Sequence, residues 1–219
     1  MKKLLLSIAI FVCVFNVNSQ TLKLKSGPSI TEMKWNHSDD FYSKKQIGFH
    51  SSAGIEYLNK NLFSLSSCIG YSRIGGDGSI EITTIEEPEG AGTMDTKTKL
   101  DILLLNTTIN FKYSINKISP YIGLGPKFEY LISYDENITF LKTFENSENL
   151  NKMIYGILGI AGVNYELEKI RIGIEFNYNY NLNKLIDYSF YSPFLQQEIK
   201  NEISYSYLSF LFIIGYKIK

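Results

Sequence analysis

The chain has 219 residues, in which 22 lysine and arginine residues are balanced by 22 aspartate and glutamate residues. This balance leaves no overall field to attract nucleic acid or a strongly acidic partner, so no nucleic-acid partner is expected. Tyrosine and phenylalanine are abundant, at 16 and 14 residues, whereas tryptophan occurs once. The length suits one domain with a sizeable core or one closed barrel.

The first residues differ in character from the rest. Lys2 and Lys3 precede an apolar run, and Val17-Asn18-Ser19 resembles a small-residue cleavage site. This order is typical of a secretory signal peptide, and the run is too short for a comfortable transmembrane helix. We predict a cleaved signal peptide over residues 1–19 and one exported domain over residues 20–219.

Strict alternation of apolar and polar residues then recurs along the chain, which predicts β-strands with one apolar and one polar face. Eight strands are expected, over residues 22–35, 47–58, 62–73, 99–113, 118–133, 152–167, 170–182 and 202–219. The sixth is apolar on both faces, so its orientation stays open. Pro120 and Pro126 in the fifth lack a donor, so a local bend or bulge is expected there. The seventh, Ile170–Leu182, alternates without exception.

The connections alternate in length. Long polar segments occupy residues 37–45, 75–97, 134–151 and 183–201, and short turns occupy residues 59–61, 116–117 and 166–169. An even number of antiparallel strands with short turns on one side and long loops on the other is typical of bacterial outer-membrane barrels. The sequence therefore predicts an all-β, eight-stranded antiparallel transmembrane β-barrel in the cell outer membrane.

Charges on the polar strand faces decide which face looks at lipid. An outward Lys or Arg at mid-bilayer would cost about 2–4 kcal/mol, whereas charges inside a narrow barrel can pair. We therefore expect the apolar faces to be outside and a charge network in the lumen, formed by Lys25, Glu56, Arg73, Lys112, Lys127, Glu129, Arg171 and Glu175. The inverse assignment, a soluble lipocalin-like barrel, would place rows of Ile, Phe and Tyr in water and is disfavoured.

Several segments carry a resemblance to a known family. They are Gly48–Gly54, Tyr71–Gly75, Tyr121–Pro126, Phe176–Leu182 and Gly215–Ile218. In these segments the chain resembles the small outer-membrane β-barrel proteins of Bacteroidota, often called PorT-like. The resemblance extends over the whole domain, and it implies a barrel inserted by the barrel-insertion machinery. It identifies a type of barrel better than it identifies a molecular function.

Few residues suit catalysis or metal binding. His50 falls on an inward strand face, where a polar histidine in a hydrogen-bond network is the simpler interpretation, and His37 beside Asp39 and Asp40 lies in a loop. Cys68, the one cysteine of the exported domain, is expected to be inward and inert. We predict no catalytic, cofactor-binding or metal site, and no cofactor.

External loops are where a barrel of this size can bind partners. The second and third long loops are acidic, through Asp77, Glu81, Glu86, Glu87, Glu89, Asp95, Asp135, Glu136, Glu145 and Glu148. We predict a non-enzymatic structural or surface-interaction protein that contacts outer-membrane lipid and lipopolysaccharide, with a surface partner at these loops. A minor channel or secretion-associated component is the alternative, and a lipid-modifying enzyme is the third hypothesis.

Overall fold

The computed structural model describes residues 20–36, 42–82, 92–137, 149–192 and 196–218. These ranges contain nine β-strands. They are β1 (Gln20–Trp35), β2 (Lys44–Tyr57), β3 (Phe63–Ile82), β4 (Gly92–Lys112), β5 (Ile118–Glu136), β6 (Met153–Glu166), β7 (Ile170–Asn181), β8 (Ile186–Ser192) and β9 (Gln197–Ile218). None of the described residues forms a helix long and apolar enough to span a membrane.

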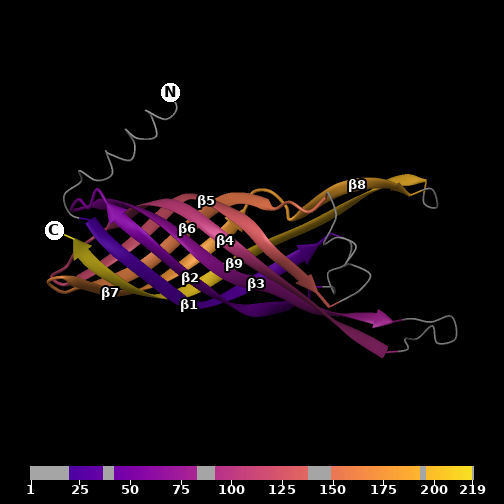
Figure 1. Ribbon diagram of the computed structural model, residues 1–219, viewed down its shortest axis with the longest axis horizontal. Coiled ribbons are helices and arrows are strands. Elements are labelled where there is room, and N and C mark those ends of the chain that lie inside the picture. The colour runs from indigo at the N-terminus through magenta and orange to yellow at the C-terminus, as the bar shows by residue number, and fades with distance from the viewer. Residues whose placement is uncertain (1–19, 37–41, 83–91, 138–148, 193–195, 219) are drawn as a thin grey trace, which may run out of the picture.

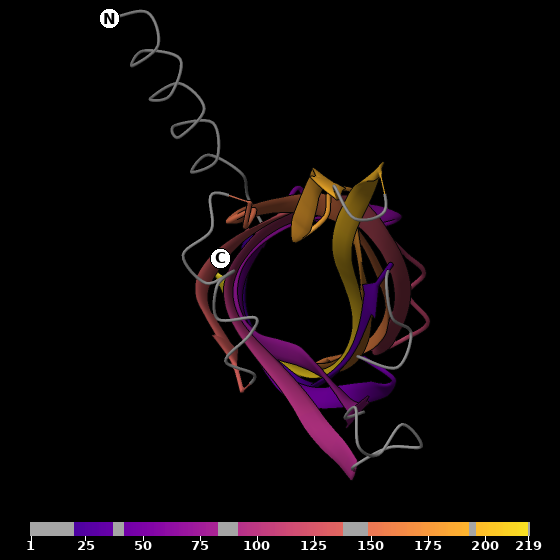
Figure 2. The ribbon, with the colours of Figure 1, turned by 90° about the vertical axis from the view of Figure 1, so that its right-hand side faces the viewer.

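Eight of these strands form a closed antiparallel ring. Each strand from β1 to β7 pairs with the next, β7 pairs with β9, and β9 pairs back with β1. Figure 2 shows this ring viewed along its axis, and Figure 1 shows it from the side, with the strands tilted relative to the axis. Closure removes the unpaired edges that a membrane does not tolerate. The predicted eight-stranded barrel is confirmed.

The ninth strand lies outside the ring. β8 pairs only with the first part of β9, from Ile186 opposite Ile203 to Ser192 opposite Gln197. The resulting hairpin extends beyond the barrel wall (Figure 1). The sequence predicts a loop here, and this prediction is wrong. Outside a bilayer a strand needs only its hydrogen-bonded ladder, so its residues need not alternate between apolar and polar, and no strand pattern is visible in the sequence.

The paired ends of β3 and β4 form a second ribbon that extends beyond the barrel wall. The β3–β4 ladder continues from Ile74 opposite Leu100 to Ile82 opposite Gly92, through residues expected to be a loop. At Gly75 this ladder leaves no room for a side chain, since a Cβ there would lie 2.0 Å from the carbonyl oxygen of Thr98.

Burial alternates along the strands of the ring as expected. In β7, Ile172, Ile174 and Phe176 face outward, while Arg171 and Glu175 are buried inside. The structure also settles β6, in which Leu158 and Ile160 face inward and Ile157 and Val163 face outward. The apolar exterior therefore runs round the whole ring.

Of the bend or bulge predicted at Pro120 and Pro126 of β5, the bulge is absent. The β4–β5 ladder keeps one register past Pro126, since Asn106 faces Lys127 and Ile109 faces Leu124. The register shifts instead near the outer end of the barrel, between Asp101 and Ile102. Proline removes a donor without inserting a residue, so it can interrupt hydrogen bonds without shifting the register.

Candidate functional site

Ion pairs fill the interior nearest the short turns. Glu56 of β2 forms buried ion pairs with Lys23 of β1 and Arg171 of β7, the second at 2.8 Å. Arg171 also lies 2.6 Å from Glu166 at the end of β6. A small pocket of about 10 Å³ beside these groups has room for about one water molecule. The lumen is therefore closed at this level by paired side chains.

A second set of paired charges lies further along the same strands. Lys25 and Glu175 form a buried ion pair at 2.6 Å. The other oxygen of Glu175 accepts a hydrogen bond of 2.6 Å from the Tyr121 hydroxyl of β5. Leu158, Ile160 and Ile213 pack with Tyr121 in an apolar cluster. Charge pairing and apolar packing together occupy this part of the lumen.

Glu129 on β5 organises a third set. It accepts hydrogen bonds from Lys127 at 2.5 Å, from Tyr205 at 2.6 Å and from Tyr207 at 2.8 Å. The Lys127 ammonium group also lies 5.0 Å from the centre of the Tyr207 ring, within reach of a cation–π attraction. Four side chains from β5 and β9 thus form one satisfied buried network across the interior.

The outer mouth is closed by apolar side chains rather than by charges. Leu185 and Ile186, just before and at the start of β8, are buried with residues from most of the ring. The other buried members of this cluster are Met33, Tyr42, Ile74, Leu100, Ile102, Leu131, Tyr134, Ile154, Ile203, Tyr205 and Tyr207. Glu136 lies beside this cluster and accepts hydrogen bonds from Tyr134 and Thr98.

Six of the eight residues predicted for the lumenal network are buried inside the barrel and paired. They are Lys25, Glu56, Lys127, Glu129, Arg171 and Glu175. Lys112 is half-buried at the short-turn end, where it donates to the side chain of Asn59. Glu136, expected in an acidic external loop, also points inward and is buried.

The prediction that Arg73 lies in the lumen is wrong. Its side chain is on the outer face and 59% exposed, and it forms an ion pair of 2.8 Å with Asp101. Strand parity explains this position: Ser72 is buried inside, so its neighbour Arg73 must point outward together with Tyr71. Arg73 lies directly before Ile74, where the β3–β4 ribbon leaves the wall, and it faces Asp101 on β4 and Phe49 on β2, so we place its charge at the outer rim of the wall and not in the lipid core.

The buried lumenal residues that are absent from the predicted charge network are Lys23, Tyr121, Tyr205 and Tyr207. Lys23 shares the parity of Lys25, and this signal was present in the sequence. The tyrosines were harder to assign, because tyrosine also fits the interfacial girdles on the outside of a barrel. Tyr205 and Tyr207 stand at alternate positions with Ser209, which is buried. A polar serine at this position therefore indicates that the two tyrosines also point inward.

Two residues considered for chemistry are enclosed. His50 is buried, with Nδ1 2.6 Å from the Ser72 hydroxyl and Nε2 3.3 Å from the Ser52 hydroxyl. Cys68 is free and buried. His37, Asp39 and Asp40 lie outside the described residues. The pocket at the short-turn end is lined by Glu56 and Arg171 and does not include His50.

A membrane-spanning barrel with a packed interior is the class that this geometry defines. The sequence matches the family of outer membrane protein beta-barrel domains over residues 14–187. The chain belongs to this family, which places it in the outer membrane. No curated protein matches the sequence.

Solved structures of outer-membrane proteins share the fold. Neisserial surface protein A matches with a TM-score of 0.50 and 10% identity, over 90% of this chain and 97% of that chain. The outer membrane protein OprG from Pseudomonas aeruginosa matches with a TM-score of 0.50 and 12% identity, over 92% and 97%. The outer membrane protease OmpT from Escherichia coli matches with a TM-score of 0.50 and 8% identity, over 93% and 98%. At these identities the likeness concerns the fold alone.

Proposed function

We propose that this protein is a closed, non-enzymatic outer-membrane barrel with a structural or surface-interaction role. The observation that carries the proposal is the filled lumen: three sets of buried ion pairs lie below an apolar cluster at the outer mouth. Eight strands enclose only enough room for side chains. A pathway for ions would have to separate charges that are already paired.

Electrical recording tests the closed barrel. Folded protein, identified by a gel mobility that changes on boiling, is added to planar lipid bilayers beside a porin as positive control. The closed barrel is expected to give no steady conductance steps at concentrations where the porin gives many. Reproducible steps of one size would contradict the proposal and favour the alternative of a minor channel or secretion-associated component.

Two ribbons would provide the surface for interaction. The β3–β4 ribbon and the β8–β9 hairpin both extend past the ring at the end with the long connections (Figure 1). The hairpin carries Tyr191 exposed near its tip, together with ion pairs from Lys184 and Lys200 to Glu202. A folded, projecting ribbon loses less conformational entropy on binding than a flexible loop, so we infer that a surface partner contacts these ribbons.

The surroundings of His50 support the non-enzymatic proposal over a lipid-modifying enzyme. Both ring nitrogens lie beside serine hydroxyls inside the wall, and an enzyme acting on lipid A must bring its catalytic group to the lipid. Mass spectrometry of lipid A from cells with wild type, a deletion and His50→Ala tests this. We expect three identical spectra, and a modification lost in both the deletion and His50→Ala would overturn the proposal.

We also propose that the protein is a Bacteroidota barrel that is exported through a cleaved signal peptide. The PorT-like segments, including Tyr121–Pro126 and Phe176–Leu182, suggest a member of the Bacteroidota group that uses the barrel-insertion machinery. Export through a signal peptide over residues 1–19 is supported by Lys2 and Lys3, the apolar run that follows them and the small-residue segment Val17-Asn18-Ser19. Mass spectrometry of protein isolated from outer membranes tests the cleavage: an N-terminus other than Gln20 would contradict the predicted site.

A further inference from the structure

The outer wall of three neighbouring strands, β9, β1 and β2, changes from apolar to polar in a single step, and β7 beside them carries a tyrosine on each side of the step. One row of paired, outward-facing residues is apolar or aromatic: Tyr178, Leu208, Ile30 and Ile47. The next row toward the long connections consists of Tyr180, Ser206 and Glu32, and it continues to Lys45 through an ion pair. Such a step marks where the hydrocarbon of the outer leaflet gives way to headgroups.

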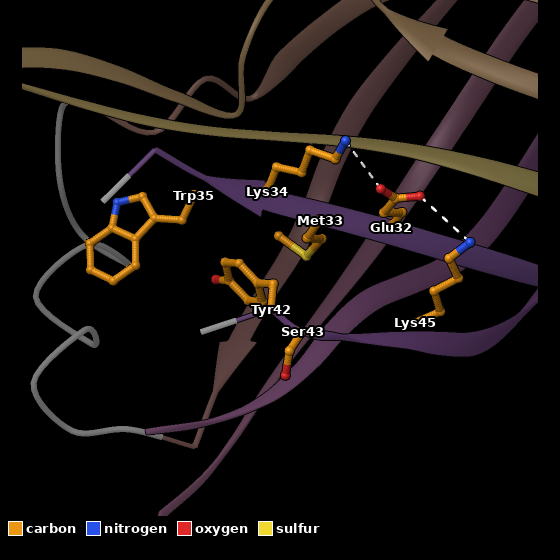
Figure 3. Close-up of a pocket in the computed structure, with 7 residues that line it drawn as sticks. All are labelled: Glu32, Met33, Lys34, Trp35, Tyr42, Ser43 and Lys45. Carbon is orange, nitrogen blue, oxygen red and sulfur yellow. Dashed lines mark ion pairs between the residues drawn. The ribbon is translucent and has the colours of Figure 1, made fainter. Parts of the chain in front are cut away.

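Two lysines dominate the polar side of this step. Lys34 and Lys45 lie on either side of Glu32, with ammonium-to-carboxylate distances of 3.2 Å and 3.7 Å, and Figure 3 shows both converging on this carboxylate. Their side chains are 74% and 66% exposed. One carboxylate cannot balance two ammonium groups, so this surface has a net charge of +1 and ammonium hydrogens available to a further ligand.

The same surface is hollow on both sides of Lys34. The β1–β2 ladder ends at Thr31 opposite Gln46, and beyond it a pocket of about 280 Å³ opens beside Trp35, Tyr42 and Ser43. On the other side of Lys34, a second pocket of about 320 Å³ lies against Tyr178 and Tyr180. Cations, hydroxyl groups and aromatic side chains therefore line two neighbouring depressions on the polar side of the step.

We propose that this surface, formed by Glu32, Lys34, Lys45, Tyr178, Tyr180 and Ser206, binds the phosphorylated sugar headgroup of an outer-leaflet glycolipid. The phosphate would contact Lys34 and Lys45, the sugar would lie against the tyrosine rings, and the acyl chains would follow the apolar row below. Ammonium–phosphate contacts are charge-assisted and are strengthened by the low dielectric of an interface. The inference rests on the membrane barrel of the proposed function and adds a specific site to it.

Trp35 provides an internal reporter for this site. It is the single tryptophan of the chain, follows Lys34 directly and lines the first pocket (Figure 3). The protein is reconstituted in phosphatidylcholine nanodiscs with increasing amounts of bisphosphorylated lipid A, or of the same lipid A with both phosphates removed. Tryptophan emission is followed, and native mass spectrometry counts the lipid molecules that remain bound.

The variant Lys34→Gln/Lys45→Gln removes both charges, and Lys60→Gln/Lys117→Gln removes two exposed charges from the opposite turns as a matched control. We expect the wild type and the control to bind the bisphosphorylated lipid at least about tenfold more tightly than the dephosphorylated one. The Lys34→Gln/Lys45→Gln variant is expected to lose this preference. Retention of the preference in that variant, or equal binding of both lipids by wild type, would overturn the inference.

Insertion is measured on the same samples, which separates this inference from the proposed function. A variant that keeps the heat-dependent gel mobility is folded, so its loss of phosphate preference reports on the site. A wild type that inserts as a barrel but shows no phosphate preference contradicts only the glycolipid site. A wild type that fails to enter nanodiscs contradicts the membrane barrel itself.

Discussion

Lys25 and Glu175 meet at 2.6 Å in the barrel interior although a whole strand, β9, lies between their own strands β1 and β7 in the ring. Arg171 and Glu56 make the same kind of connection over β9 and β1. Both pairs therefore bridge the place where the last strand meets the first. Barrel closure joins the two ends of the domain, and these ion pairs hold that junction from inside.

Breaking the Lys25–Glu175 pair by one substitution should be costly. Lys25→Met leaves Glu175 buried with only the Tyr121 hydroxyl, and we expect a loss of about 3–5 kcal/mol in the free energy of unfolding. The double variant Lys25→Met/Glu175→Met should be more stable than Lys25→Met, since it leaves no unpaired charge. Urea unfolding in lipid vesicles measures all variants. A double variant less stable than the single one would contradict this account.

The two arginines of the predicted network should behave differently. Arg171→Gln removes a buried partner of Glu56 and Glu166, with an expected cost of the order of 3 kcal/mol. Arg73→Gln removes an exposed partner of Asp101, and its effect on the same unfolding curve should be within experimental error. Equal losses in the two variants would show that Arg73 does not lie outside the wall.

Hydrogen bonds from Tyr207 and Tyr205 to Glu129 can be removed one hydroxyl at a time. Tyr207→Phe keeps the ring beside Lys127 but removes a donor to a buried carboxylate, so we expect a loss of about 1.5–3 kcal/mol. Tyr180→Phe, on the exposed face of β7, is the matched control and should change the unfolding free energy little. If both variants unfold alike, Glu129 does not depend on the tyrosine hydroxyl.

Ile186 should contribute to closure of the outer mouth. Its side chain is fully buried in the apolar cluster, so Ile186→Ala is expected to cost about 2–5 kcal/mol through lost burial and a cavity. The β8–β9 hairpin should then be cut faster by protease added outside. Ile122→Ala on the lipid-facing surface leaves no core cavity, and it should leave the cleavage rate unchanged. Unchanged cleavage in Ile186→Ala would contradict packing of the hairpin base against the mouth.

Cys68 offers a direct measure of enclosure. Because its thiol is buried within the wall, a water-soluble thiol reagent should react with it only after unfolding. The variant Cys68→Ser/Asn61→Cys places the thiol in an exposed turn and should react at once in the folded state. Rapid labelling of Cys68 in the folded barrel would indicate a water-filled lumen.

The alternation of inward and outward residues along a strand explains both the correct predictions for the barrel wall and the wrong prediction for Arg73. It placed Arg171 and Glu175 inside and Ile172 and Ile174 outside, because a bilayer demands one apolar face from every spanning strand. The same rule, applied from Ser72, would have placed Arg73 outside. The predicted third strand ends at Arg73. Its side chain was therefore placed in the lumen because it is charged, and not because of its position in the alternation.

The sequence by itself determined the parts of the molecule on which the bilayer imposes a pattern: eight strands, the outward faces of all of them but the sixth, and the side on which each turn lies. Only the tertiary structure decided the rest. The extensions of β3, β4 and β9 and the whole of β8 lie beyond the bilayer, where backbone pairing leaves no periodic signature. The pairing of Lys25 with Glu175 and of Arg171 with Glu56 depends on the register at which β9 closes the ring on β1 and β7, and the meeting of Lys34 and Lys45 at Glu32 depends on how β1 lies beside β2.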